Sequence, residues 1–399
     1  AKIVNGIPGN TFARSIREDP DREGLLYTGT ENGLFVSFDD GANWQPFDLN
    51  LPEVPITDLR IRQQDLVVAT QGRSLWILDD LTPLHQISDA VASAGMHLYD
   101  PRDPYRTIAS GYYAEGGPGE NPPAGLQINY VLGDAVASDV PMSMEILDSA
   151  DRVVFAEYAP DDRPDCEASP RPRRLRRSAG ANRWSWDMSI GRFACIEEIT
   201  NTSRNLSAYP ATPGRYTARL TVGGEVQSQD FEILIDPRLD GIAADPVSEY
   251  EELDRISASI FESAQAMERG VMALQRALGQ VEFALGIAKS GAVVEGGVAL
   301  SATIDGWVEK ILQKRLETSQ NNYMFEARLL MKYKDFLGRI GGANIPVTIG
   351  VRDVTRDYQA EWAEYEVELQ RILAEEIPAY NQILGAAGLP EIYLPRPVT

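Results

Sequence analysis

The chain has few of the residues that carry redox and metal chemistry. Its 399 residues include only two cysteines and two histidines, His85 and His97. Metal sites built on histidine need clustered ligands, so this pair predicts no metal centre, and no cofactor is expected. The chain also lacks a Cys-x-x-Cys pair, a Gly-x-Ser-x-Gly nucleophile motif and a phosphate-binding loop. Redox, peptidase and nucleotide chemistry therefore find no support.

Basic residues and long apolar runs are also scarce. The 37 Lys and Arg residues face 59 Asp and Glu residues, which gives a formal net charge of −22. Binding to nucleic acid needs a basic surface, so the acid excess argues against a nucleic-acid partner. The sequence contains no run of eighteen apolar residues, and we expect no membrane span.

The two cysteines, Cys166 and Cys195, lie in one loop-rich region and form a candidate disulfide. Pairing would fit a secreted protein, and two free buried thiols are the alternative. The chain begins at Ala1 without a Met, a basic segment or an apolar segment. We therefore expect a processed or excised piece whose signal peptide was removed or belonged to a longer precursor.

One structural motif is present in a single copy. Residues 37–44 read SFDDGANW and fit the pattern S-x-D-x-G-x-x-W, the Asp box of β-propeller blades. Asp39, beside Ser37, can accept hydrogen bonds from turn N–H groups, while Gly41 takes a positive φ and Trp44 covers the blade. The motif predicts a structural role and not a catalytic one.

A single Asp box cannot make a propeller, because the ring closes only when several four-stranded blades shield each other's edges. Residues 1–100 are therefore predicted to hold only the terminal blade or blades. Turn residues separate six strand-like runs in this region. The runs are 12–17, 25–30, 34–38, 57–62, 66–70 and 74–78.

The remainder of the chain divides into a linker, a β-sandwich and a helical bundle. Residues 101–125 are rich in Pro, Gly and Tyr, which predicts a linker or a long loop. Residues 126–240 carry six short strand-like runs and fit a sandwich of immunoglobulin or fibronectin type. A Gly223-Gly224 hairpin is the best defined turn in that region. The predicted runs are 126–131, 142–147, 153–158, 183–188, 214–222 and 226–235.

Residues 241–399 are predicted to be helical. Apolar residues recur at steps of three and four from residue 264 onward, which is the stripe of a long packed helix. Three further amphipathic segments follow, and Pro378 is expected to kink or end the last one. Four such helices predict an antiparallel bundle, so the fold class is multidomain β plus α.

Several segments resemble a known family. Residues 24–34, the Asp box and residues 65–80 resemble the final blades of bacterial BNR-repeat, sortilin-like β-propeller proteins, which are often labelled glycosyl hydrolases. The motifs WSWD at 184–187 and PGRYTARL at 213–220 resemble the sandwich of that family. The helical tail near 385–390 resembles its C-terminal region. The resemblance implies a secreted, periplasmic or cell-surface bacterial protein whose remaining blades lie upstream.

The leading hypothesis is a non-catalytic structural and interaction chain. Its blade strands would complete a propeller with an N-terminal partner polypeptide or the remainder of a precursor. The sandwich and the helical bundle would bind a partner or form a homo-oligomer. A carbohydrate or a peptide, as in sortilin, is the candidate ligand.

The alternative is a glycoside hydrolase whose active cleft lies mainly on blades outside this chain. Arg73, Asp79 and Asp80 would then form part of the rim that contacts sugar, although a local ion pair is the structural alternative for Arg73. Glycoside hydrolysis needs two carboxylates that flank one sugar bond. No such pair can be assigned from the sequence.

Overall fold

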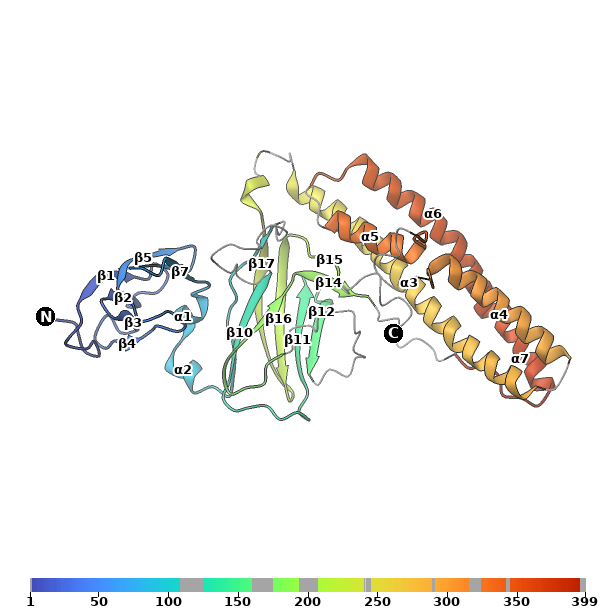
Figure 1. Ribbon diagram of the computed structural model, residues 1–399, viewed down its shortest axis with the longest axis horizontal. Helices are drawn as coiled ribbons and strands as arrows, with labels where there is room; N and C mark the ends of the chain where they lie inside the picture. Colours follow the sequence, from blue (N-terminus) through green and yellow to red (C-terminus); the bar gives the residue numbers. More distant parts are fainter. Residues whose placement is uncertain are drawn as a thin grey trace.

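The computed structural model shows a mixed β and α protein with three parts in a row (Figure 1). An N-terminal β part is followed by a central β part and then by a helical part. The structure describes residues 2–107, 125–159, 175–193, 207–239, 241, 245–288, 291–315, 324–341 and 345–394. Within these ranges, none of the helices combines the length and apolarity that a bilayer crossing requires.

The N-terminal part consists of two antiparallel sheets, one with four strands and one with three. All six predicted runs are strands, and only the two-residue β4 is additional. The first sheet contains β1 (Ala13–Glu18), β2 (Leu26–Thr30), β3 (Gly33–Ser37) and β4 (Gln45–Pro46). The second contains β5 (Ile56–Arg62), β6 (Asp65–Thr70) and β7 (Leu75–Leu78).

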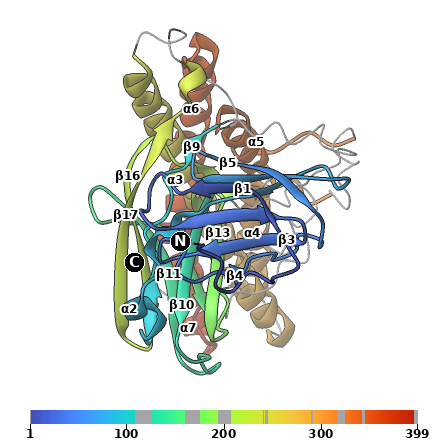
Figure 2. The same ribbon diagram turned by 90° about the vertical axis from the view of Figure 1, so that its left-hand side faces the viewer.

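The two N-terminal sheets pack face to face over one apolar core. Tyr27, Leu59 and Leu66 are fully buried there. Gly29 on β2 allows the close approach, because a Cβ at this position would lie 2.4 Å from Ile56 Cγ2. Figure 2, seen from the N-terminal end, shows β1 and β3 running crosswise to β10, β16 and β17 of the central part.

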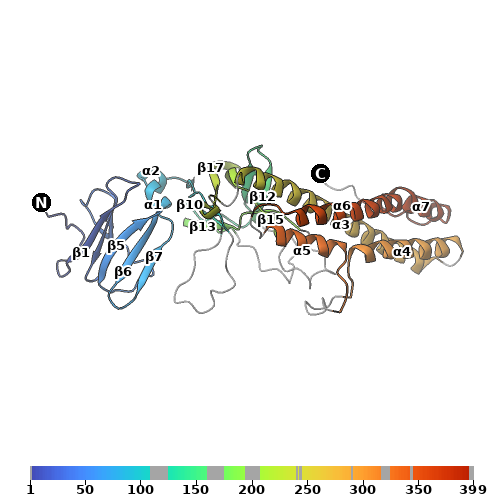
Figure 3. The same cartoon turned by 90° about the horizontal axis from the view of Figure 1, so that it is seen from above.

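Two short helices that the sequence did not predict lead to the central part. They are α1 (Thr82–Gln86) and α2 (Asp89–Ala92). Leu81, directly before α1, is fully buried in the core of the N-terminal sheets. Both helices lie between these sheets and the central part (Figure 3).

The described residues of the central part form two larger sheets and a separate strand pair. The three-stranded sheet has the order β13 (Gly180–Trp186), β10 (Leu126–Leu132), β8 (Met96–Leu98). The five-stranded sheet has the order β12 (Val153–Ala159), β11 (Met142–Asp148), β16 (Gly214–Val222), β17 (Glu225–Ile235), β9 (Tyr105–Arg106). The strand pair is β14 (Ser189–Arg192) and β15 (Ser207–Pro210).

All six strands predicted between residues 126 and 240 are present, and the Gly223-Gly224 turn joins β16 to β17. The predicted boundary is corrected in one respect. β8 and β9 already pair with strands of the central part, so this part begins upstream of residue 126, and residues 105–106 are strand and not linker. Residues 108–124 of the predicted linker and the candidate disulfide residues Cys166 and Cys195 lie outside the described ranges.

The helical part is built on one long helix. The helices are α3 (Pro246–Ile287), α4 (Ala292–Ile311), α5 (Leu329–Gly341), α6 (Ile349–Arg371) and α7 (Ile377–Ala386), with a π turn at Ile372–Glu376. The Asp245 side chain caps α3 by accepting from the Ser248 N–H. Apolar residues at steps of three and four along α3 face the other helices, as the sequence predicted.

The arrangement is three rods, which refines the predicted bundle of four antiparallel helices. α4 and then α5 run back along α3. The rod formed by α6, the π turn and α7 runs parallel to α3, since Arg352 bonds to Glu252 and Gln359 bonds to Ser259. Pro378 does not end this rod. It lies in the first turn of α7, directly after the π turn, in which the Ile377 N–H donates to the Ile372 carbonyl five residues back.

The strand pair β14–β15 joins the central part to the helices. Phe261 on α3 contacts the rings of Phe193 and Tyr209 edge to face, at centroid distances of 5.2 and 5.8 Å. The Arg106 guanidinium lies over the ring of Tyr250 and donates to the Gly341 carbonyl at 3.2 Å. Apolar and polar contacts therefore connect these two parts.

Candidate functional site

The Asp box forms the turn between β3 and β4. The Ser37 hydroxyl donates to Asp39 Oδ1 at 2.8 Å and accepts from the Gly41 N–H at 2.9 Å. The Asn43 N–H donates to Asp39 Oδ1 at 2.8 Å, and its side-chain amide donates to Oδ2 at 2.6 Å. Ser37 and Asp39 therefore close the turn, which is the arrangement that the motif predicted.

The other two motif residues complete this turn. Gly41 has a φ of +81°, a value that glycine adopts readily. Trp44 is buried with Leu26 and Phe35 on the face of the first sheet that points away from the second. Its indole N–H donates to the Ile3 carbonyl at 2.9 Å. Trp44 therefore ties the N-terminal segment to the sheet.

The hydrogen bonds from Asn43 and Ser37 hold the pKa of Asp39 below its ordinary value of 3.8. A carboxyl with a lowered pKa stabilises the fold above the unfolded pKa, and this contribution is lost as the pH falls through the folded pKa. We expect Asp39→Asn to reduce the loss of thermal stability of the N-terminal part between about pH 5 and pH 2. Thermal unfolding across this range measures it. Asp40→Asn, as the control, should keep the wild-type acid sensitivity, and an Asp39→Asn profile identical to wild type would contradict the assignment.

The three residues predicted to form a ligand rim do not come together. Arg73 lies in the exposed turn between β6 and β7, whereas Asp79 and Asp80 follow the far end of β7. Asp80 is buried, and its carboxylate accepts from the Thr82 hydroxyl at 2.5 Å and from the Asn129 amide at 3.2 Å. Burial, followed by the charge of Asp65, raises the pKa of Asp79. These two carboxyls belong to the junction with the central part.

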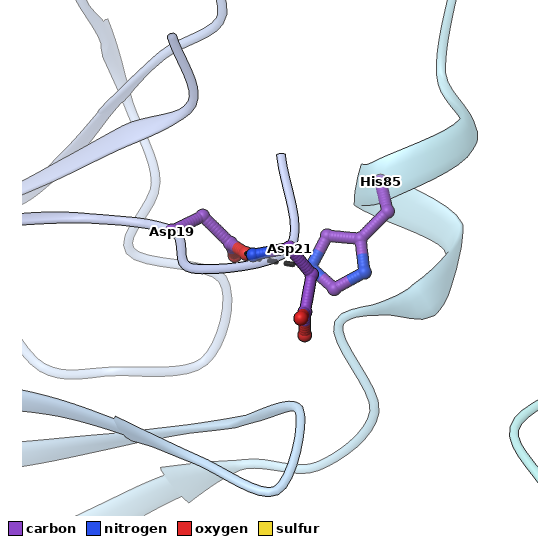
Figure 4. Close-up of side chains that lie close together, drawn as sticks. All are labelled: Asp19, Asp21 and His85. Carbon is purple, nitrogen blue, oxygen red and sulfur yellow. Dashed lines mark hydrogen bonds and ion pairs between the residues drawn. The ribbon is translucent and has the colours of Figure 1, made fainter. Parts of the chain in front are cut away.

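Figure 4 shows a polar cluster that the sequence did not predict: Asp19 and Asp21, from the turn after β1, lie beside His85 of α1. His85 Nε2 lies 3.0 Å from Asp19 Oδ2. The Tyr27 hydroxyl donates to the same oxygen at 3.0 Å, and the Asp21 N–H donates to Oδ1 at 2.9 Å. The buried Asp19 carboxylate thus binds α1 to the first sheet.

The same cluster is the one group of the described residues with the spacing of a metal site. Asp19, Asp21 and His85 offer ligand atoms within 4.8 Å of one another. The three hydrogen bonds to Asp19 already satisfy its buried charge, so the cluster is explained without a metal. His85 lies 64 positions after Asp21 in the chain, so no local sequence pattern could bring the two together; the pair Asp19-Pro20 signals only a turn after β1.

The second N-terminal sheet has an open edge and an exposed apolar face. Along β6, Leu66 and Val68 point into the core between the sheets, so Val67 and Ala69 lie on the opposite face. Their cross-strand partners are Ile77 and Leu75. Leu75 is 68% exposed and Ile77 is 58% exposed. Among the described residues, no strand pairs with the outer edge of β7.

Comparisons with known proteins identify no family for the chain. No protein family and no curated protein matches it. One solved structure, the extracellular domain of a hybrid two-component system from B. thetaiotaomicron, aligns with 12% sequence identity and a TM-score of 0.16. The alignment covers 58% of this chain and 26% of that chain. A structural alignment with so low a TM-score shows no common fold.

Proposed function

We propose that this chain is a structural and interaction chain whose two N-terminal sheets are terminal blades of a β-propeller. A separate N-terminal polypeptide, or the remainder of a precursor, would complete the ring. The observation that carries the proposal is the second sheet. It has one strand fewer than the first, and a strand placed beside β7 would occupy the position that β4 has beside β3.

Both outward faces of the two-sheet stack carry exposed apolar side chains. This is expected of propeller blades whose neighbouring blades are contributed by another polypeptide. Leu75 and Ile77 are exposed on one side. On the other side lies Ile16, which is 47% exposed and pairs with Thr28 on the face away from the second sheet. Exposed apolar faces and open strand edges are interaction surfaces or aggregation templates. A partner that contributes blades would cover both.

We assign the central part to the immunoglobulin and fibronectin class of β-sandwiches. Among the described residues, one sheet holds β8, β10 and β13. The other holds β11, β12, β16 and β17, together with the short β9, which runs parallel to β17. The Tyr216 hydroxyl, near the start of β16, donates to the Thr212 carbonyl at 3.0 Å. This hydrogen bond resembles the tyrosine corner of such domains and supports the assignment. In our proposal the sandwich is a spacer between the blades and the helices.

We further propose a secreted, periplasmic or cell-surface location in a bacterium. The net charge of −22 and the family resemblance of the blade segments support it. The glycoside hydrolase alternative gains no support from the rim residues. Arg73 lies at the opposite end of β7 from Asp79 and Asp80, and Asp80 is engaged by Thr82 and Asn129.

The test is native mass spectrometry of tagged chains isolated from the source organism. We expect the wild-type chain in a complex with a second polypeptide rich in Asp boxes. The double variant Leu75→Lys/Ile77→Lys should reduce the amount of this complex by at least about tenfold, because two charges would be buried against an apolar face.

The control is Val367→Lys, which changes an equally exposed apolar residue on α6 and should leave the complex intact. A wild-type chain that is monomeric in its source, with residues 1–81 folded, would overturn the proposal. A complex that survives the double variant would also overturn it. Oligomers of this chain alone would overturn it as well, and would indicate that the open face of the second sheet binds a second copy of the chain.

A further inference from the structure

A cleft of about 810 Å³ lies where the second N-terminal sheet meets the central part. Its walls come from the turn between β5 and β6, from α1, from the segment around β9 and from the paired strands β16 and β17. The size is in the range of small-molecule sites. The cleft is separate from the outward edge of β7 and from the Asp box.

Several polar groups in this cleft are free to bind a ligand. The side chains of Gln63, Gln64, Arg215 and Glu232 have no hydrogen-bond or ion-pair partner among the described residues. They line the cleft together with Tyr105, which is 41% exposed. The set offers amide donors and acceptors, a guanidinium donor, a carboxylate acceptor and one aromatic ring.

The two glutamines stand on a strained turn. Gln63 and Gln64 have φ values of +51° and +63°, the left-handed conformation that two-residue hairpins usually assign to Asn or Gly. Non-glycine residues adopt it at an energetic cost, and such strain is concentrated at functional positions. The Leu81 N–H donates to the Gln64 carbonyl at 2.8 Å, which holds the backbone of the turn and leaves both side-chain amides free.

The charge of the cleft selects among polar ligands. Asp100, Asp103, Asp230 and Glu232 line it, whereas Arg102 is already paired with Asp65 at 2.7 Å. Burial, together with the charges of Asp103 and Asp230, raises the pKa of Asp100. Arg215 is therefore the one cation of the described lining without a carboxylate partner, and an anionic ligand would be repelled.

We propose that this cleft binds a neutral oligosaccharide. Vicinal hydroxyls both donate and accept hydrogen bonds, which matches amide, carboxylate and guanidinium groups on opposing walls. The exposed ring of Tyr105 provides an apolar platform for the C–H face of a sugar ring. Sialic and uronic acids are excluded by the surrounding carboxylates. This binding goes beyond the proposed assembly role and does not depend on it.

The experiment is a glycan array probed with the full chain, followed by calorimetric titration of the best-bound neutral oligosaccharide. We expect binding to neutral glycans and not to sialylated or uronate glycans. Tyr105→Ala should weaken the affinity at least tenfold. Gln64→Gly should weaken it similarly while leaving the melting temperature unchanged or higher, because glycine relaxes the left-handed turn.

Asp151→Gly is the matched control, since Asp151 has a φ of +58° in the β11–β12 hairpin, outside the cleft. It should relax the backbone in the same way and leave binding unchanged. Three results would each overturn the proposal: no neutral glycan bound, a preference for anionic glycans, or binding that survives both Tyr105→Ala and Gln64→Gly. None of these would affect the assembly proposal, whose test uses β7.

Discussion

Lys334→Met is expected to destabilise the helical part by about 3–5 kcal/mol, because it leaves a carboxylate buried without its cation. Lys334 on α5 forms an ion pair with Glu268 on α3 at 2.7 Å, and the side chains are only 10% and 3% exposed. The ammonium also lies 4.4 Å from the centroid of the Phe193 ring. The pair therefore connects α3, α5 and the end of β14 in one buried contact.

Urea unfolding followed by circular dichroism at 222 nm measures this effect, since the helical part dominates that signal. Lys314→Met is the matched control. Its partner Asp305 and the lysine itself are 47% and 35% exposed, so we expect a loss below about 1 kcal/mol. The double variant Lys334→Met/Glu268→Leu should recover most of the stability, because no unpaired charge remains. Equal effects of Lys334→Met and Lys314→Met would contradict the buried pair.

Trp186→Ala is expected to destabilise the central part by about 3–5 kcal/mol, the range for removing a buried aromatic side chain. Trp186 is 1% exposed. Its ring centroid lies 6.1 to 6.3 Å from those of Phe155, Tyr216 and Phe231, so this β13 residue packs against three strands of the opposite sheet. Its indole N–H donates to the Ser189 carbonyl at 3.0 Å.

Hydrogen exchange of β10, β11 and β16 reports this loss in the central part alone. Tyr158→Ala removes an aromatic side chain from β12 that is 50% exposed, and it should change protection little. Protection in β16 that is unaffected by Trp186→Ala would show that this ring does not hold the two sheets together. The N-terminal sheets should keep their exchange rates in both variants, because their core is separate.

Local sequence patterns predicted most of the regular structure. The six runs in the N-terminal part and the six in the central part are strands because alternating apolar residues, bounded by Gly, Pro, Asn and Asp, satisfy both the pleat and the turns. The long stripe from residue 264 lies within α3 for the same kind of local reason. The short elements β4, β8, β9, β14, β15, α1 and α2 were not predicted, because two to five residues carry too little periodicity.

The candidate sites were less predictable. The Asp box could be placed from the sequence, because the side-chain hydrogen bonds of Ser37 and Asp39 that close its turn run within residues 37–43. The cluster of Asp19 and His85 joins residues 66 positions apart. The cleft joins the β5–β6 turn to β16 and β17, more than 150 residues later. No pattern within one element reports such contacts.

The sequence by itself determined the order of a β region, a second β region and a helical region, together with most strands, the Asp box turn and the acidic surface. Each of these features depends on the residues themselves and on their neighbours in the chain, because covalent geometry fixes the spacing of successive side chains. Only the tertiary structure decided which edge of β7 stays open, that Asp80 serves the junction, that α6 runs parallel to α3, and which free side chains share a cleft. Those features depend on how separate elements pack, and packing is a property of contacts between residues distant in sequence.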